Sequence, residues 1–169
     1  MVLYRPSALE TALSLPLDLF APEPHLKLSG IAVSLASVLE DDNKPQEAYE
    51  VYSTVFERLR KAGKLSGKER LRTVAIAYKL GEMAEIYQLP VGEEERWLVY
   101  AVEEMLRLLK DEQQVTRGVR EEDAHNATGE QDQSLTLDEL DLPPWVNQTD
   151  VVAPLQALGS FYNKVGKQE

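Results

Sequence analysis

Apolar side chains recur along this chain at the spacing of one face of a helix, and the first such stretch covers residues 28–40. Its large apolar residues are Ile31, Leu35, Val38 and Leu39. This spacing predicts a helix that buries one side. Turn-forming residues at 41–44 interrupt the pattern, and Pro45 suits the first turn of a second helix because that turn needs no proline N–H. Residues 28–61 therefore predict a helical hairpin.

A second hairpin is predicted over residues 66–110. Ser66 and Glu69 have the spacing of a capping box, in which the serine oxygen accepts a backbone hydrogen bond and the glutamate returns one. A long helix is therefore expected to begin there. Its partner helix, at roughly residues 93–110, carries Trp97 among the apolar residues of one face. A tryptophan at that spacing predicts packing in the core.

The remaining segments of the chain are less periodic. Residues 111–135 are polar and acidic, and we expect a mobile acidic insertion there. Residues 136–148 predict a short helix followed by an extended proline corner, with Trp145 packed on the core. Apolar spacing returns over residues 150–166, which predicts a further helix. Residues 1–27 predict a short N-terminal helix that caps the first hairpin.

The order of large and small residues in these helices resembles the tetratricopeptide repeat (TPR). In the first hairpin, repeat positions 7, 8, 11, 20 and 24 are Leu35, Ala36, Leu39, Ala48 and Tyr52. In the second hairpin, Leu80 and Gly81 repeat the pair at positions 7 and 8. In the last helix, positions 7, 8, 11 and 15 are Leu158, Gly159, Tyr162 and Gly166. The resemblance implies that the small residues let paired helices approach closely and that Gly166 ends its helix.

From this resemblance we expect an all-α fold, a TPR-like superhelix (solenoid) of helical hairpins with irregular repeats and a truncated last repeat. The second half of that repeat would lie beyond Glu169, so the chain is expected to be a fragment of a longer protein. Four segments are further similar to fungal mitochondrial TPR proteins, most of all to the inner-membrane adaptors of the i-AAA protease. These segments are residues 29–31, 80–84, 142–145 and 158–162.

The resemblance to those adaptors implies a location and a role. An anchor would precede Met1, and the domain would lie in the mitochondrial intermembrane space at the inner membrane. There it would present unfolded substrates to the i-AAA protease. The fragment itself would need no contact with the membrane.

In the TPR family the concave face is lined by the first helix of each pair. By repeat register, the predicted protein-binding groove consists of Val33, Ser37, Glu40, Tyr78, Glu82, Glu85, Gln156, Ser160 and Asn163. TPR domains that hold the carboxylate tails of chaperones place lysine and asparagine where this chain has Val33 and Ser37, so that clamp is not expected. Small, apolar and acidic groups suit an extended or helical apolar segment, with or without basic residues, better than an anionic tail.

Composition and motifs narrow the function classes. The 18 Lys plus Arg and 29 Asp plus Glu residues give a net charge of −11, which disfavours nucleic acid as a partner. The chain has no cysteine, two histidines and no phosphate loop, HExxH motif or nucleophile elbow. We therefore expect neither an enzyme nor a cofactor or metal site. The acidic run 92–95 is expected to be a solvated helix start, where the helix dipole favours negative charge.

Two non-catalytic roles remain open. One is an adaptor whose groove binds unfolded or extended protein segments. The other is a structural assembly factor that joins folded subunits through the convex face of the superhelix or through the segment 111–150. Deleting that segment separates the two roles, because only the second predicts loss of partner binding while groove binding survives.

Overall fold

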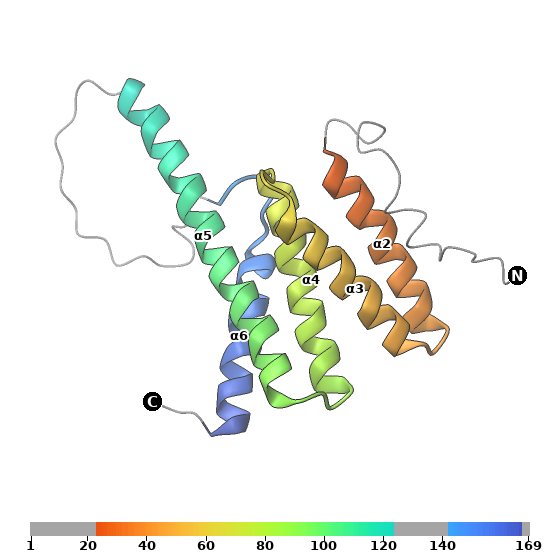
Figure 1. Cartoon of the computed structure of the whole chain (residues 1–169). Coiled ribbons are helices and arrows are strands. Elements are labelled where there is room, and N and C mark those ends of the chain that lie inside the picture. The colour runs from red at the N-terminus through yellow and green to blue at the C-terminus, as the bar shows by residue number, and fades with distance from the viewer. Residues whose placement is uncertain (1–22, 124–141, 167–169) are drawn as a thin grey trace, which may run out of the picture.

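The computed structural model describes residues 23–123 and 142–166, and Figure 1 shows their arrangement. These residues form the helices α2 (Pro24–Asp41), α3 (Pro45–Lys61), α4 (Gly67–Ile86), α5 (Val91–Asp123) and α6 (Gln148–Val165). This part of the chain contains no strand, so the prediction of an all-α fold is confirmed. The capping helix expected within residues 1–27 lies mostly outside the described residues.

Local signals in the sequence set several of the helix ends. Pro24 and Pro45 occupy the first turn of α2 and of α3, where a proline N–H would have no helical partner. At the start of α4, the Glu69 N–H donates to Ser66 Oγ (3.3 Å) and the Ser66 N–H donates to Glu69 Oε2 (2.9 Å), which confirms the capping box. α6 ends at Gly166, whose φ of +74° lies in the left-handed region that suits glycine.

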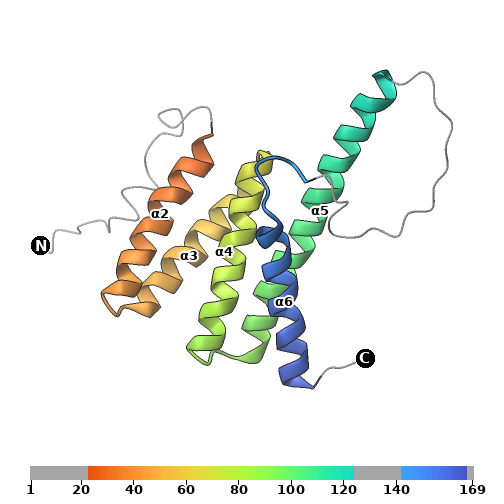
Figure 2. The same cartoon turned by 180° about the vertical axis from the view of Figure 1, so that it is seen from behind.

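The helices pack mainly on their neighbours in the chain. α2 pairs with α3 and α4 pairs with α5, each as an antiparallel hairpin, while α3 and α4 join the two hairpins. α6 packs along α5. In the reverse view of Figure 2, α6 is nearer to the viewer than the helices of the second hairpin. Two hairpins followed by one helix are also the order of elements that the apolar periodicity predicts. The superhelical stacking of a TPR array stays a prediction.

The core lies between the two hairpins and extends to α6. Its most deeply buried large side chains are Phe56, Ile76, Leu80, Met83, Met105, Leu108 and Phe161. Trp145, in the connection before α6, is partly buried against this core. It lies over Gly67 at the start of α4, where an added Cβ would come within 2.6 Å of the indole ring. The predicted packing role of Trp145 is therefore confirmed.

Gly81 of α4 and Gly159 of α6 occupy the same predicted repeat position but have different surroundings. A Cβ on Gly81 would lie 2.7 Å from Leu98 Cδ2 of α5. The small residue there lets two helices approach closely, as the repeat pattern predicts. A Cβ on Gly159 would meet nothing within 4 Å, and Gly159 itself is exposed. At this repeat position α4 therefore packs closely against α5, whereas no described residue packs closely against α6.

α5 is longer than the sequence pattern predicts. It continues through Asp123, so the expected insertion over residues 111–135 is wrong for residues 111–123. That stretch is rich in Glu, Gln and Arg, which have high helix propensity. Figure 1 shows this end of α5 projecting beyond the other helices. Residues 124–135 lie outside the described residues.

Two further boundaries differ from the prediction. α2 begins at Pro24 rather than at residue 28, because the proline supplies a start that apolar periodicity alone does not reveal. The proline corner is a closed turn rather than an extended one, since the Val146 N–H donates to Pro143 O (2.9 Å). The short helix predicted before that corner falls largely on residues 136–141, outside the described residues.

Candidate protein-binding surface

The predicted groove residues of α2 lie in different surroundings. Val33 is partly buried against the core, whereas Ser37 is exposed. Glu40 joins three helices, because the Tyr52 O–H of α3 donates to its Oε1 (3.0 Å) and Lys79 Nζ of α4 lies 2.9 Å from its Oε2. Burial, together with this hydrogen bond, raises the pKa of Tyr52. Glu40 is thus already engaged in holding α2, α3 and α4 together.

Three predicted groove residues meet in one cavity between α4 and α6. The cavity measures about 150 Å³, and its walls include Glu82 and Glu85 of α4 and Ser160 of α6. Leu98 and Phe161 supply apolar parts of the wall. This volume can hold several water molecules or the end of a side chain. The fold therefore brings together predicted residues from two helices that are far apart in the sequence.

The other predicted residues of this face lie outside the cavity. Tyr78 is partly buried one helical turn before Glu82. Burial raises the pKa of the Tyr78 hydroxyl, and the Glu82 carboxylate adds to the shift. Gln156 and Asn163 are exposed on α6. The face consequently combines one partly buried aromatic residue with exposed polar groups and an acidic cavity.

Lys164 and Glu94 also line this cavity, and sequence reasoning missed both. Lys164 Nζ of α6 lies 3.0 Å from Glu85 Oε1 and 3.0 Å from Glu94 Oε1. The hydrogen bonds to Glu94 and Glu85 raise the pKa of Lys164. The Glu94 side chain is 8% exposed, so the expectation of a solvated helix start is wrong for this residue. A lysine in the last turn of a helix is favoured by the helix dipole alone, so its position in the sequence does not show that it pairs with a particular carboxylate.

Further contacts fix α6 against the start of α5. The Tyr162 O–H donates to Glu95 Oε1 (3.2 Å). Phe161, next to it, is 1% exposed, and Val151 at the other end of α6 is 3% exposed. The position of α6, and with it the shape of the cavity, thus depends on both apolar and polar contacts.

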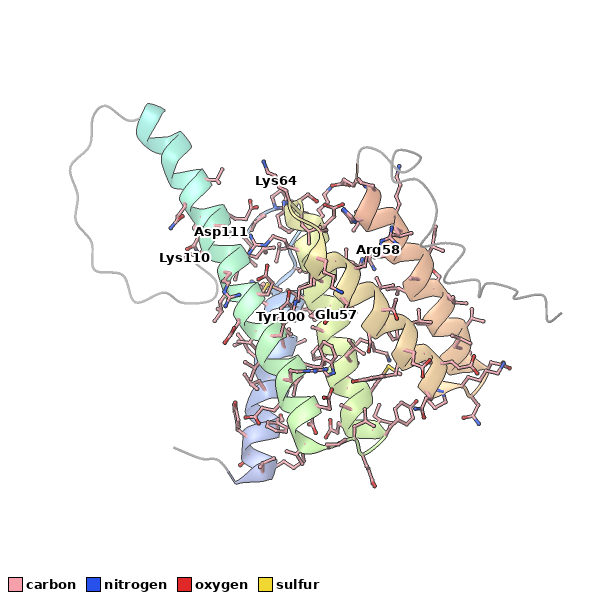
Figure 3. The ribbon with its side chains drawn as sticks, viewed as in Figure 1. Glu57, Arg58, Lys64, Tyr100, Lys110 and Asp111 are labelled. Atoms are coloured by element: carbon pink, nitrogen blue, oxygen red, sulfur yellow. The ribbon has the colours of Figure 1, made fainter. Side chains whose placement is uncertain are left out.

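An aromatic cluster joins α3 to α5. Trp97 Nε1 donates to Tyr49 Oη (2.9 Å), and Phe56 packs edge-on against Trp97 and against Tyr100 with ring centroids 4.8 Å apart in both pairs. Tyr100 and Glu57, labelled in Figure 3, line a small hollow beside the cluster. Trp97 is 4% exposed, which confirms its predicted packing role. The aromatic cluster therefore packs the two hairpins together and does not form an open binding site.

Within residues 23–123 and 142–166, no group of three or more histidine, cysteine, aspartate or glutamate residues is placed to hold a metal ion. In the same part of the chain, no helix is both long enough and apolar enough to cross a membrane.

Comparison of the chain with protein-family models, with curated proteins and with solved structures finds no match.

Proposed function

We propose that this chain is a non-catalytic protein-binding adaptor whose α2, α4 and α6 face holds unfolded or extended protein segments. The observation that supports the proposal most directly is the cavity where Glu82, Glu85 and Ser160 converge. Polar groups beside the apolar walls of Leu98 and Phe161 suit a polypeptide, which offers apolar side chains and backbone amides together. A face built from separate helices also gives an extended segment room to contact more than one of them.

The charge of the face limits the kind of segment. Three carboxylates, those of Glu82, Glu85 and Glu94, line the cavity against the single ammonium group of Lys164, and the whole chain carries a net charge of −11. An acidic tail would be repelled by this surface, whereas apolar or basic segments would not. The proposal therefore concerns stretches of unfolded protein that are rich in apolar residues and poor in acidic ones.

Fluorescence anisotropy with a labelled, permanently unfolded polypeptide tests the proposal. Tyr78→Ala should weaken binding about fivefold or more, because an aromatic residue on a binding face commonly contributes more than about 1 kcal/mol. Val115→Ala, at a site 65% exposed on the projecting end of α5, is the matched control and should bind like the wild type. Circular dichroism checks that both variants stay folded. Undiminished binding by Tyr78→Ala would exclude this face.

The resemblance to mitochondrial adaptors extends the proposal to delivery of the bound segments. The chain would pass unfolded proteins to the i-AAA protease in the intermembrane space. Adding the chain should then accelerate degradation of an unfolded reporter by that protease, and the Tyr78→Ala variant should accelerate it less. An unchanged rate with the wild-type chain would refute delivery and leave segment binding intact.

A structural assembly factor is the second candidate, and the projecting end of α5 favours it. Arg70 of α4 donates to Glu104 Oε1 (2.7 Å) and to Asp111 Oδ2 (2.6 Å), which ties α5 to the bundle as far as Asp111. Figure 3 labels Asp111 where α5 leaves the other helices. Replacing residues 115–135 with a Gly-Ser linker should abolish binding of folded partners under this candidate, with binding of the unfolded polypeptide unchanged.

A further inference from the structure

The turn between α4 and α5 exposes three large apolar side chains close together in the chain. Ile86 is 66% exposed, Tyr87 42% and Val91 53%, and we call these three residues the α4–α5 corner. The turn is closed by a hydrogen bond from the Leu89 N–H to Ala84 O (2.9 Å). Large exposed apolar side chains that adjoin one another mark interaction surfaces, and these three fall within six consecutive residues of the chain.

Carboxylates flank the α4–α5 corner on both sides in the sequence. Residues 82–96 contain five glutamates and one arginine. That arginine, Arg96, is paired with Glu93 (Nη2 to Oε2, 2.7 Å). Glu85, which directly precedes the corner, has a side chain that is 60% exposed. The apolar corner therefore lies in a region of negative potential, which attracts cations and repels acidic groups.

Two of these carboxylates, those of Glu85 and Glu94, already bind an ammonium group, which belongs to Lys164. Its ammonium group lies 3.0 Å from an oxygen of Glu85 and 3.0 Å from an oxygen of Glu94, which are distances of charge-assisted hydrogen bonds. An ionised carboxylate accepts several hydrogen bonds. Because Glu85 is more than half exposed, its carboxylate can accept a second cation from outside the molecule.

We infer that the α4–α5 corner docks a polypeptide segment in which apolar residues are flanked by lysine or arginine. The apolar residues cover Ile86 and Val91, and a flanking ammonium or guanidinium group binds Glu85 beside Lys164. The inference rests on the proposed function, since it names the chemistry of the segment that the adjoining face holds. A second copy of this chain fits less well, because two chains of net charge −11 repel each other.

Two labelled synthetic peptides test the inference with the full chain. One carries leucines flanked by lysines, and the other carries the same leucines flanked by glutamates. The lysine peptide should bind at least tenfold more tightly, and the difference should shrink at high salt. Glu85→Gln and Ile86→Ser should each weaken binding of the lysine peptide several-fold. Leu106→Ser, at a site 52% exposed elsewhere on α5, is the matched control and should not.

Lys164→Gln gives a test with the opposite sign. Removing the internal ammonium leaves Glu85 and Glu94 without the cation that they share, so the lysine peptide should bind more tightly than to the wild type. If Lys164 only held α6 in place, the same variant would bind the peptide less tightly, and the inference would be wrong about how the peptide's cation is bound. The unfolding temperature of the variant shows whether α6 stays docked.

The outcomes separate this inference from the proposed function. Equal binding of the two peptides, or unchanged binding after Glu85→Gln and Ile86→Ser, overturns the inference. If the unfolded polypeptide still binds and still depends on Tyr78, the proposed function survives that result. If no polypeptide binds at all, both fail. A dimer in sedimentation experiments that Ile86→Ser abolishes would identify a second copy as the occupant and would also overturn the inference.

Discussion

Alanine substitutions at Gly81 and at Gly159 should change the stability of the fold in opposite directions. Both glycines lie inside helices, α4 and α6 respectively, at the same predicted position of the repeat. Replacing a helical glycine with alanine reduces the freedom of the unfolded chain and favours the helix by about 1 kcal/mol. The atoms around each glycine decide whether the new methyl group adds a steric cost that offsets this gain in stability.

At Gly81 the new methyl group collides with α5. It would lie 2.7 Å from Leu98 Cδ2 and 3.0 Å from Leu98 Cγ, whereas nonbonded carbon atoms prefer about 3.5–4.0 Å. Leu98 is 3% exposed, and because its Cγ is also too close, its side chain has to turn into the cavity that it lines to relieve the contact. Overpacking of this kind costs about 1–3 kcal/mol. After the helix gain is subtracted, Gly81→Ala should lower the free energy of unfolding by about 1 kcal/mol.

At Gly159 the new methyl group meets no other atom within 4 Å. Only the helix gain remains, so Gly159→Ala should raise the free energy of unfolding by about 0.5–1 kcal/mol. The two substitutions are chemically identical, and the difference between them measures how closely α4 and α5 approach.

Urea titrations followed by far-ultraviolet circular dichroism provide the assay. The two variants should fall on opposite sides of the wild type, about 2 kcal/mol apart. The double variant Gly81→Ala with Leu98→Ala should lose less stability than the sum of its single variants, because the colliding side chain is gone. A Gly81→Ala variant as stable as Gly159→Ala would refute the close packing of α4 on α5.

Three further substitutions probe the other contacts. Ser66→Ala removes the cap of α4 and should lower the free energy of unfolding by about 1 kcal/mol in urea titrations. Trp97→Phe removes the hydrogen bond to Tyr49 and should cost about 1–2 kcal/mol, measured in the same way. Lys164→Gln should lower the unfolding temperature at neutral pH. Because the pKa of Lys164 is raised, its contribution is complete below the unfolded-state pKa of 10.5 and is lost as the pH rises through the folded-state value. The difference from the wild type should therefore shrink above that pH.

The helices could be predicted because their signals are local. The Ser66 capping box and the glycine at 166 act within one or two turns of chain, so their positions in the sequence carry the information. α5 shows the limit of the same reasoning. Residues 111–115 lack an apolar face and are largely exposed, as the pattern predicts, but exposure does not prevent a helix when the residues favour one.

The candidate site was predictable only in part. Repeat register places Glu82, Glu85 and Ser160 on one face, and the fold brings them to one cavity. The ion pair between Lys164 and Glu94 joins residues 70 positions apart, and no spacing in the sequence links them. It depends on where α6 docks, which is decided by burial of Phe161 and by contacts with α5. Lys164 and Glu94 meet only through the docking of α6, and periodicity therefore does not identify them as partners.

The contact that holds α6 and the surface proposed to dock a basic segment share the carboxylate of Glu85. Lys164, near the end of α6, forms an ion pair with that carboxylate. Salt therefore screens both this ion pair and the attraction between Glu85 and a cationic peptide. The two effects can be separated with an uncharged apolar peptide. If α6 loosens in salt, the cavity between α4 and α6 changes shape, and binding of the uncharged peptide falls as well. If burial of Phe161 keeps α6 docked, salt lowers only the affinity for the lysine peptide. Glu85 can then bind a partner's cation without loosening α6.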